Sequence, residues 1–135
     1  MADELMVEIV TPEKMVFSGK IEEVTIPGGD GEFGVLIGHA PLLSTVDIGV
    51  LNYTKNGKKI YYAVGAGYAE VTLDKVTVLI ESAERADMID KEKVKELKEL
   101  AEQKLSGISK GNPDYETAKA ALENAENTLK VAERV

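Results

Sequence analysis

Apolar and polar residues alternate along the first 85 or so residues, which is typical of strands with one buried face. The segments MVEIVT, EEVTI and KVTVLIE are short and rich in Val, Ile and Thr, which suit a half-buried pleated surface. No helical pattern lies between these segments. Many short strands at close spacing predict an antiparallel sandwich or barrel.

Two short turns are expected between the later strands. Lys55-Asn56-Gly57-Lys58 joins the strand-like segments 50–54 and 59–64. Asn-Gly tolerates the positive φ that a tight hairpin turn requires, so this is the strongest local signal in the chain. Leu73-Asp74-Lys75 separates segments 68–72 and 76–80, and it predicts a second turn.

The pattern becomes helical near Asp87. From Asp90 the sequence contains strong helix formers, and one apolar stripe steps by three or four residues through Val94, Leu97, Ala101, Leu105 and Ile108. We expect Asp90 to cap this helix and the stretch 107–111 to end it. Asn112 and Pro113 then predict a second helix start, because Asn can cap and Pro fits the first helical position.

The second helix has a heptad-like seam of Tyr115, Ala118, Leu122, Ala125, Leu129 and Ala132. A short connector between two amphipathic helices predicts an antiparallel hairpin. The expected fold class is therefore α+β. We expect a β domain over residues 1–87 and a helical hairpin over residues 88–135.

Composition and charge exclude several classes of protein. The chain has 135 residues, no Cys and a formal net charge of −8, of which residues 1–87 contribute −7 and residues 88–135 contribute −1. An acidic chain is unsuited to general nucleic-acid binding, which requires Lys and Arg against phosphates. The absence of Cys excludes disulfides and thiolate metal sites. We expect neither a signal peptide nor a membrane helix, because no apolar run approaches about 20 residues.

Two features resemble chemical motifs without the context those motifs need. Residues 29–34 match G-x-G-x-x-G, but Val35, Leu36 and Ile37 follow where a dinucleotide site requires a helix. His39 is the single histidine, and no nucleophile motif accompanies it. We therefore expect a glycine-rich loop, a loop or interface histidine, no catalytic residue and no metal site.

The chain as a whole resembles the epsilon-subunit family of F-type ATP synthases. The most specific segment has the form Gly-Glu-x-Gly followed by Gly-His-x-Pro-Leu, and the helical tail is the least specific part. The matching segments run in order along nearly the whole chain: Val10-Thr11-Pro12, Phe17-Ser18-Gly19, residues 31–43, residues 65–71, residues 75–79 and Ala83-Glu84-Arg85-Ala86.

This resemblance implies a ten-stranded β-sandwich with a two-helix C-terminal domain, acting as a non-catalytic subunit of the rotating central stalk. The implied partners are the gamma subunit, the ring of c subunits and, through extended C-terminal helices that hinder ATP hydrolysis, the catalytic alpha and beta subunits. Glu32 matches the position that faces the c-ring, and His39 matches a position near gamma. The implied location is peripheral, on the cytoplasmic face of the bacterial plasma membrane.

Some bacterial members of this family bind ATP through Ile/Leu-Asp-x-x-Arg-Ala at the first helix. Here residues 89–94 keep Ile89 and Asp90, but Lys93 replaces Arg and Val94 replaces Ala. Lys lacks the planar fork of Arg, and Leu100 stands where a second Arg is common. We expect no cofactor, and a residual nucleotide site would use Glu84, Ile89, Asp90 and Lys93.

Two rival functions remain open from the sequence. One is a small sandwich enzyme or ligand-binding protein that uses residues 29–34. The other is a free-standing nucleotide sensor built on Asp90 and Lys93. An enzyme should offer a convergent set of titrating groups, and the sequence shows none.

Overall fold

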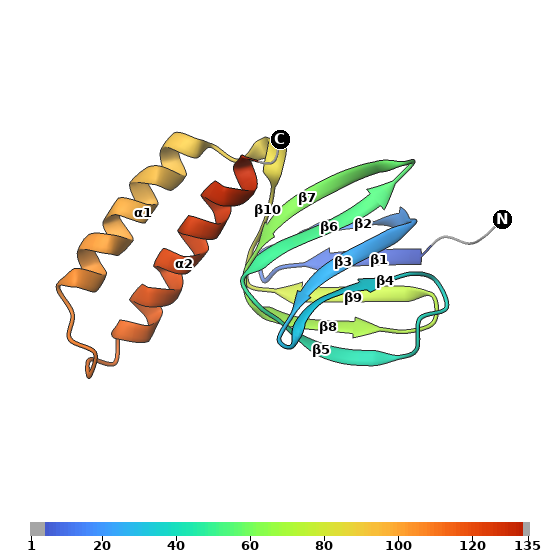
Figure 1. The fold of residues 1–135 in the computed structure, drawn as a ribbon, viewed down its shortest axis with the longest axis horizontal. Helices are drawn as coiled ribbons and strands as arrows, with labels where there is room; N and C mark the ends of the chain where they lie inside the picture. Colours follow the sequence, from blue (N-terminus) through green and yellow to red (C-terminus); the bar gives the residue numbers. More distant parts are fainter. Residues whose placement is uncertain (1–4, 134–135) are drawn as a thin grey trace.

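A computed structural model describes residues 5–133 of the chain, which form ten strands followed by helices (Figure 1). The strands are β1 (Leu5–Val10), β2 (Met15–Ile21), β3 (Glu23–Gly28), β4 (Gly31–Val35), β5 (Leu42–Val46), β6 (Gly49–Lys55), β7 (Lys58–Val64), β8 (Gly67–Val71), β9 (Lys75–Ile80) and β10 (Ala83–Arg85). The helices are the 3-10 helix η1 (Ala86–Met88), α1 (Lys91–Ser106) and α2 (Tyr115–Ala132). The predicted sandwich with a two-helix tail is confirmed.

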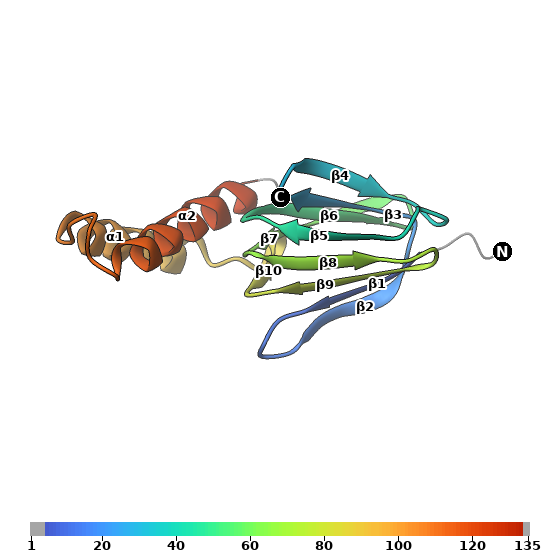
Figure 2. The same ribbon diagram turned by 90° about the horizontal axis from the view of Figure 1, so that it is seen from below.

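The ten strands form one continuous sheet that folds over into two layers. The strand order is β10-β7-β6-β3-β5-β8-β9-β1-β2, and β4 pairs with the other edge of β3. The layers join where Gly28 of β3 pairs with Val46 of β5. Figure 2 shows β5, β8, β9, β1 and β2 side by side in the second layer.

One strand pair differs from the expected antiparallel arrangement. β1 and β9 are parallel, in register from Met6 opposite Lys75 to Val10 opposite Leu79. Alternating polarity shows which side chains point inward, but it carries no information about strand direction. The N-terminal strand therefore enters between β9 and β2, where the sequence offers no signal for it.

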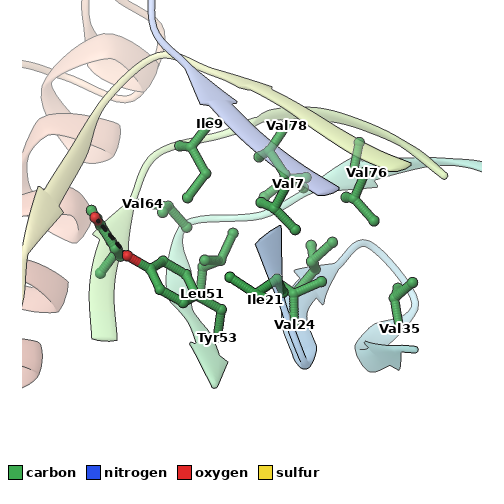
Figure 3. Close-up of a cluster of buried hydrophobic side chains, with 14 of the residues drawn as sticks. Val7, Ile9, Ile21, Val24, Val35, Leu51, Tyr53, Val64, Val76 and Val78 are labelled. Atoms are coloured by element: carbon green, nitrogen blue, oxygen red, sulfur yellow. Dashed lines mark hydrogen bonds between the residues drawn. The ribbon is translucent and has the colours of Figure 1, made fainter. Parts of the chain in front are cut away.

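The core lies between the two layers and consists mainly of aliphatic side chains (Figure 3). β1 and β9 each send every second residue inward, and these residues are at most 3% exposed: Leu5, Val7, Ile9, Val76, Val78 and Ile80. Burying each such side chain contributes roughly 1.5–3 kcal/mol. The predicted alternation therefore explains why the sandwich forms.

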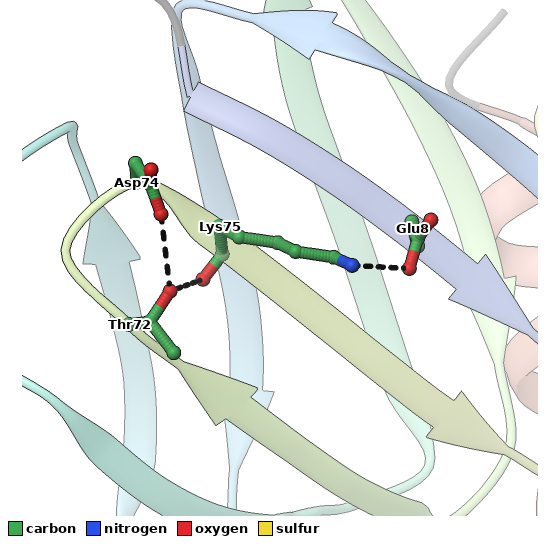
Figure 4. A network of polar contacts seen from close by, with 4 residues as sticks. All are labelled: Glu8, Thr72, Asp74 and Lys75. Atoms are coloured by element: carbon green, nitrogen blue, oxygen red, sulfur yellow. Dashed lines mark hydrogen bonds and ion pairs between the residues drawn. The ribbon is translucent and has the colours of Figure 1, made fainter.

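Both predicted turns are present. Asn56 and Gly57 join β6 to β7, with φ values of 53° and 76°, as a tight turn of this type requires. Thr72 stabilises the β8–β9 turn, because its hydroxyl lies 3.5 Å from Asp74 Oδ1 and 3.2 Å from the Lys75 carbonyl oxygen (Figure 4). Lys75 also forms a 3.0 Å ion pair with Glu8 across the parallel strands.

The helices begin and pack close to expectation, with two corrections. Asp90 caps α1 as predicted, and its Oδ1 accepts a hydrogen bond from the Lys93 N–H at 3.2 Å. α2 begins at Tyr115, two residues beyond Pro113, because the Asn112 side chain instead accepts the Asp114 N–H in a turn before the helix.

The second correction concerns the stripe on α1. Leu97 is 52% exposed, whereas Val94 and Ala101 are buried and Lys98 is half-buried between them. The contact line thus passes through Lys98, whose aliphatic stem can cover apolar surface while its ammonium group stays in water. The sequence favoured Leu97 because it is apolar.

The helical hairpin contacts the sandwich mainly through α2. Val131 is fully buried against Ala63 of β7 and Ala86 of η1, in a cluster separate from the main core. The Asn127 side chain donates a 2.8 Å hydrogen bond to the Gly49 carbonyl oxygen. Figure 1 shows that α1 lies on the far side of α2 from the sandwich.

Candidate functional site

The outer face of the second layer carries a row of side chains that crosses four strands. Strand registers place Thr45 of β5 beside Tyr68 of β8, Tyr68 beside Leu79 of β9, and Leu79 beside Val10 of β1. We call these four residues the outer row. Because they point away from the core, their apolar atoms are available to a partner.

The outer row is unusually apolar for a face without a covering element. Tyr68 is 60% exposed and Leu79 is 53% exposed, and a groove of about 670 Å³ runs along them. Leu43, one row further along β5, is 72% exposed. A contiguous exposed apolar patch of this kind marks an interaction site more often than a free surface.

Close strand packing holds the outer row in place. A side chain at Gly67 would collide with the Leu79 carbonyl oxygen, so only glycine lets β8 approach β9 this closely. In the next rows the Lys75–Glu8 ion pair spans β9 and β1. The site is therefore a rigid sheet surface rather than a loop.

Sequence reasoning did not identify the outer row, although one signal was available. In β9, Val76, Val78 and Ile80 point inward, so Leu79 occupies a position where a polar residue is expected. Tyr68 likewise lies between the inward-facing Gly67 and Ala69. Large apolar residues at outward positions of neighbouring strands indicate an interface only once the register is known.

Glu32 lies on β4 rather than in a loop, which corrects the expected location of the glycine-rich segment. It is exposed, and its register partner on β3 is Pro27. Gly29 and Asp30 alone make the turn, and Gly31 has a φ of 121°. Figures 1 and 2 place this turn at the end of the sandwich nearer the helices. A strand follows the glycines, so the dinucleotide interpretation is excluded.

His39 lies in the β4–β5 connection, at the opposite end of the sandwich from the β3–β4 turn (Figure 1). Its Nδ1 is 2.7 Å from the Ala40 carbonyl oxygen, and the ring is half-buried. The Gly38 N–H donates a 2.7 Å hydrogen bond to the Leu73 carbonyl oxygen, which ties this connection to the β8–β9 turn. Glu32 and His39 are therefore not brought together.

The four residues named for nucleotide binding have other structural roles or none. Glu84 is exposed on β10, and Ile89 packs against the Val131 cluster. The Asp90 carboxylate caps α1, and Lys93 is exposed in the first helical turn. That these residues bind nucleotide weakly or not at all stays a prediction.

Residues 5–133 contain no group of three or more His, Asp or Glu side chains placed to hold a metal ion. In the same range no helix combines the length and apolar character that a membrane crossing needs.

Comparison with protein families gives matches over both parts of the chain. The model described as ATP synthase, Delta/Epsilon chain, beta-sandwich domain matches residues 4–86. The model described as ATP synthase, Delta/Epsilon chain, long alpha-helix domain matches residues 87–133.

Curated relatives match at nearly full length. An ATP synthase epsilon chain from Geobacter metallireducens is 48% identical over 132 residues, covering 98% of this chain and 96% of the relative. One from Nitratidesulfovibrio vulgaris is 47% identical over 131 residues, covering 97% of each.

Solved structures share the fold. A chain in the Euglena gracilis mitochondrial ATP synthase structure of OSCP, F1 and c-ring has a TM-score of 0.79 at 24% identity, covering 98% of this chain and 83% of that chain. A chain from the Tetrahymena thermophila central stalk and c-ring structure has a TM-score of 0.54 at 13% identity, covering 96% and 94%.

Proposed function

This chain belongs to the family of ATP synthase delta/epsilon chains, and from that premise we propose how it works as the epsilon-type subunit of an F-type ATP synthase. It is a non-catalytic subunit of the central stalk. The enzyme and free nucleotide-sensor alternatives are not favoured, because relatives named ATP synthase epsilon chain match over almost the whole length.

The proposed gamma-binding surface is the outer row. Its exposed Tyr68 and Leu79, with Leu43 nearby, are the observation that supports this proposal. A rotor subunit has to transmit torque, and a rigid sheet face bound through buried aromatic and aliphatic anchors suits that task. His39 lies in the β4–β5 connection, which leads into β5. It would contact gamma at the rim of this surface.

Substituting Tyr68→Ser or Leu79→Ser tests this surface. We expect each to weaken gamma binding by about 1–3 kcal/mol while leaving the fold intact, because both side chains are exposed in the free subunit. Affinity would be measured by calorimetry with purified gamma, and folding by circular dichroism. Leu100→Ser is the matched control, since Leu100 is also 61% exposed but lies on α1, away from the sandwich (Figure 1). Equal loss in all three variants would refute the assignment.

Glu32 is proposed to face the polar loops of the c-ring. It is exposed on a hairpin that projects beside the sheet, so Glu32→Ala should change the free energy of unfolding by no more than about 0.5 kcal/mol. Proton-coupled ATP synthesis by the reconstituted complex should fall. Glu23→Ala, a half-buried carboxylate near the opposite end of the same hairpin, serves as the control. Unchanged coupling in Glu32→Ala would reject the role.

The helical hairpin is proposed to regulate ATP hydrolysis by leaving the sandwich and extending toward the catalytic alpha and beta subunits. Its contact with the sandwich includes one small cluster and one side-chain hydrogen bond, and an open cleft of about 460 Å³ lies between the N-terminal half of α2 and residues 65–66 and 81. Such a limited contact is compatible with two arrangements of similar energy. The chain is associated with the membrane as part of the complex, and we propose the cytoplasmic face of a bacterial plasma membrane.

A further inference from the structure

The sandwich is open along the seam between β10 and β2, which are the two ends of the strand path. A cavity of about 420 Å³ lies at this seam. We call it the seam pocket, and its lining includes Phe17, Tyr53, Lys55, Lys58, Tyr62 and Arg85. It is separate from both the outer row and the α2 contact.

One wall of the seam pocket is flat and apolar. The rings of Phe17 and Tyr53 are stacked, with centroids 4.5 Å apart. Beyond them the Tyr53 and Tyr62 hydroxyls lie 3.4 Å apart, and Figure 3 shows the Tyr53 hydroxyl pointing out of the aliphatic core. Burial, followed by the Tyr62 hydroxyl, raises the pKa of Tyr53 well above its usual value, so the Tyr53 phenol stays protonated.

Two lysines stand at the mouth of the pocket. Lys55 and Lys58 are directly opposite each other across the β6–β7 ladder, and like charges in this position are destabilising. Lys55 Nζ is 5.6 Å from the Phe17 ring centroid. Neither lysine has an ion-pair partner among residues 5–133. The nearby Glu22 carboxylate instead accepts the Gly57 N–H at 2.9 Å.

Arg85 lies on β10 at the other side of the seam. Its Nε is 2.9 Å from Asp87 Oδ1, but the pair is not aligned as a hydrogen bond, and this buried N–H has no acceptor within the described chain. Asp87 compensates the charge of Arg85, so Lys55 and Lys58 are the two uncompensated cations beside the aromatic cavity, in a chain whose net charge is −8. A local field of this kind attracts anions.

We propose that the seam pocket binds a small organic anion with a flat apolar body, such as an aryl carboxylate. The carboxylate would lie between Lys55 and Lys58 and relieve their repulsion. The ring would pack on Phe17, which is half-buried and is itself stacked on Tyr53. Arg85 and the hydroxyls of Tyr53 and Tyr62 would form hydrogen bonds with a second polar group of the ligand. An inorganic anion would leave the aromatic wall exposed to water, and a neutral ligand would leave the lysines opposed.

The test measures binding of 2-naphthoate to the full chain, by calorimetry and by amide chemical shifts in NMR spectra. We expect saturable shifts at residues 53–62 and at Arg85. Naphthalene-2-methanol and inorganic phosphate should each bind about ten-fold more weakly. Lys58→Gln and Lys55→Gln should each weaken naphthoate binding about three- to five-fold, as expected for partly exposed ion pairs. Lys119→Gln, the same change on exposed α2 surface, should have no effect.

Lys58→Gln also offers a measurement that needs no ligand. Removing one of two opposed charges should raise the melting temperature of the free chain, and naphthoate should raise that of the wild type more than that of the variant. Three results would overturn the proposal: shifts confined to the outer-row groove, equal affinity for naphthalene-2-methanol, or naphthoate affinity unchanged in both lysine variants.

Discussion

Gly67 is the residue at which the outer face most requires glycine. A Cβ there would overlap the Leu79 carbonyl oxygen and crowd Ile80, so any larger residue must push β8 away from β9. Gly34 of β4 has open space where a Cβ would be. The two glycines therefore look alike in the sequence and differ entirely in their surroundings.

We expect Gly67→Ala to lower the free energy of unfolding by about 1–3 kcal/mol, the range for overpacking a close contact. Gly34→Ala should be neutral or slightly stabilising, because it only restricts the unfolded chain. Urea denaturation followed by circular dichroism measures both. Equal effects at the two positions would show that the β8–β9 approach is not what requires glycine.

Single residues were predictable where local chemistry decides the outcome. Asn56 and Gly57 adopt the expected positive φ, and Asp90 caps α1, because each depends on neighbours within a few residues. Leu97 was predicted to lie on the buried face of α1 because it is apolar. Instead Lys98 is half-buried on that face, and Leu97 is exposed. The roles of Leu79 and Arg85 could not be predicted, because their neighbours come from strands distant in sequence.

At the scale of elements, the strands, the helices and the pairing of neighbours joined by short turns could be predicted, whereas partners distant in sequence could not. The alternation in β1, β8 and β9 reports a buried face, which is a local property. The parallel β1–β9 ladder and the contact of α2 with β7 are contacts between segments far apart in the sequence. The candidate site belongs to that second kind, because the outer row exists only after four strands align.

Asn127 provides a test of how α2 is attached. Its side chain forms the 2.8 Å hydrogen bond to Gly49 O, so Asn127→Ala should loosen the hairpin by about 0.5–1.5 kcal/mol. We expect faster amide hydrogen exchange in α2, with exchange in β6 and β9 unchanged. Asn124→Ala, one turn away, is the matched control. Equal protection in both variants would mean that the Val131 cluster alone attaches the hairpin.

For the whole molecule, the separation of the two apolar clusters suggests that the parts can exist independently. The main core consists of side chains from the strands, whereas Val131 packs against Ala63 and Ala86 in a cluster of its own. We propose that residues 1–87 and residues 88–135 act as separate domains. The connection between them runs from β10 through η1, without a long linker.

Deleting residues 88–135 should leave residues 1–87 folded and able to bind gamma. Loss of the buried Val131 contact should lower the free energy of unfolding by about 1.5–3 kcal/mol. Thermal denaturation and calorimetry with gamma would measure the two properties. An unfolded fragment would contradict independent domains, whereas a folded fragment without gamma affinity would place binding in the helices.

The parallel pairing of β1 with β9 also has a consequence during synthesis on the ribosome. β1 emerges first, yet its partner residues 75–79 emerge only after the seven strands from β2 to β8 have been synthesised. Until then the edge of β1 that later pairs with β9 is unpaired. Non-local strand pairing is slow, and open edges can join those of other chains. The last step of sandwich closure is therefore the point at which the nascent subunit depends most on protection from aggregation.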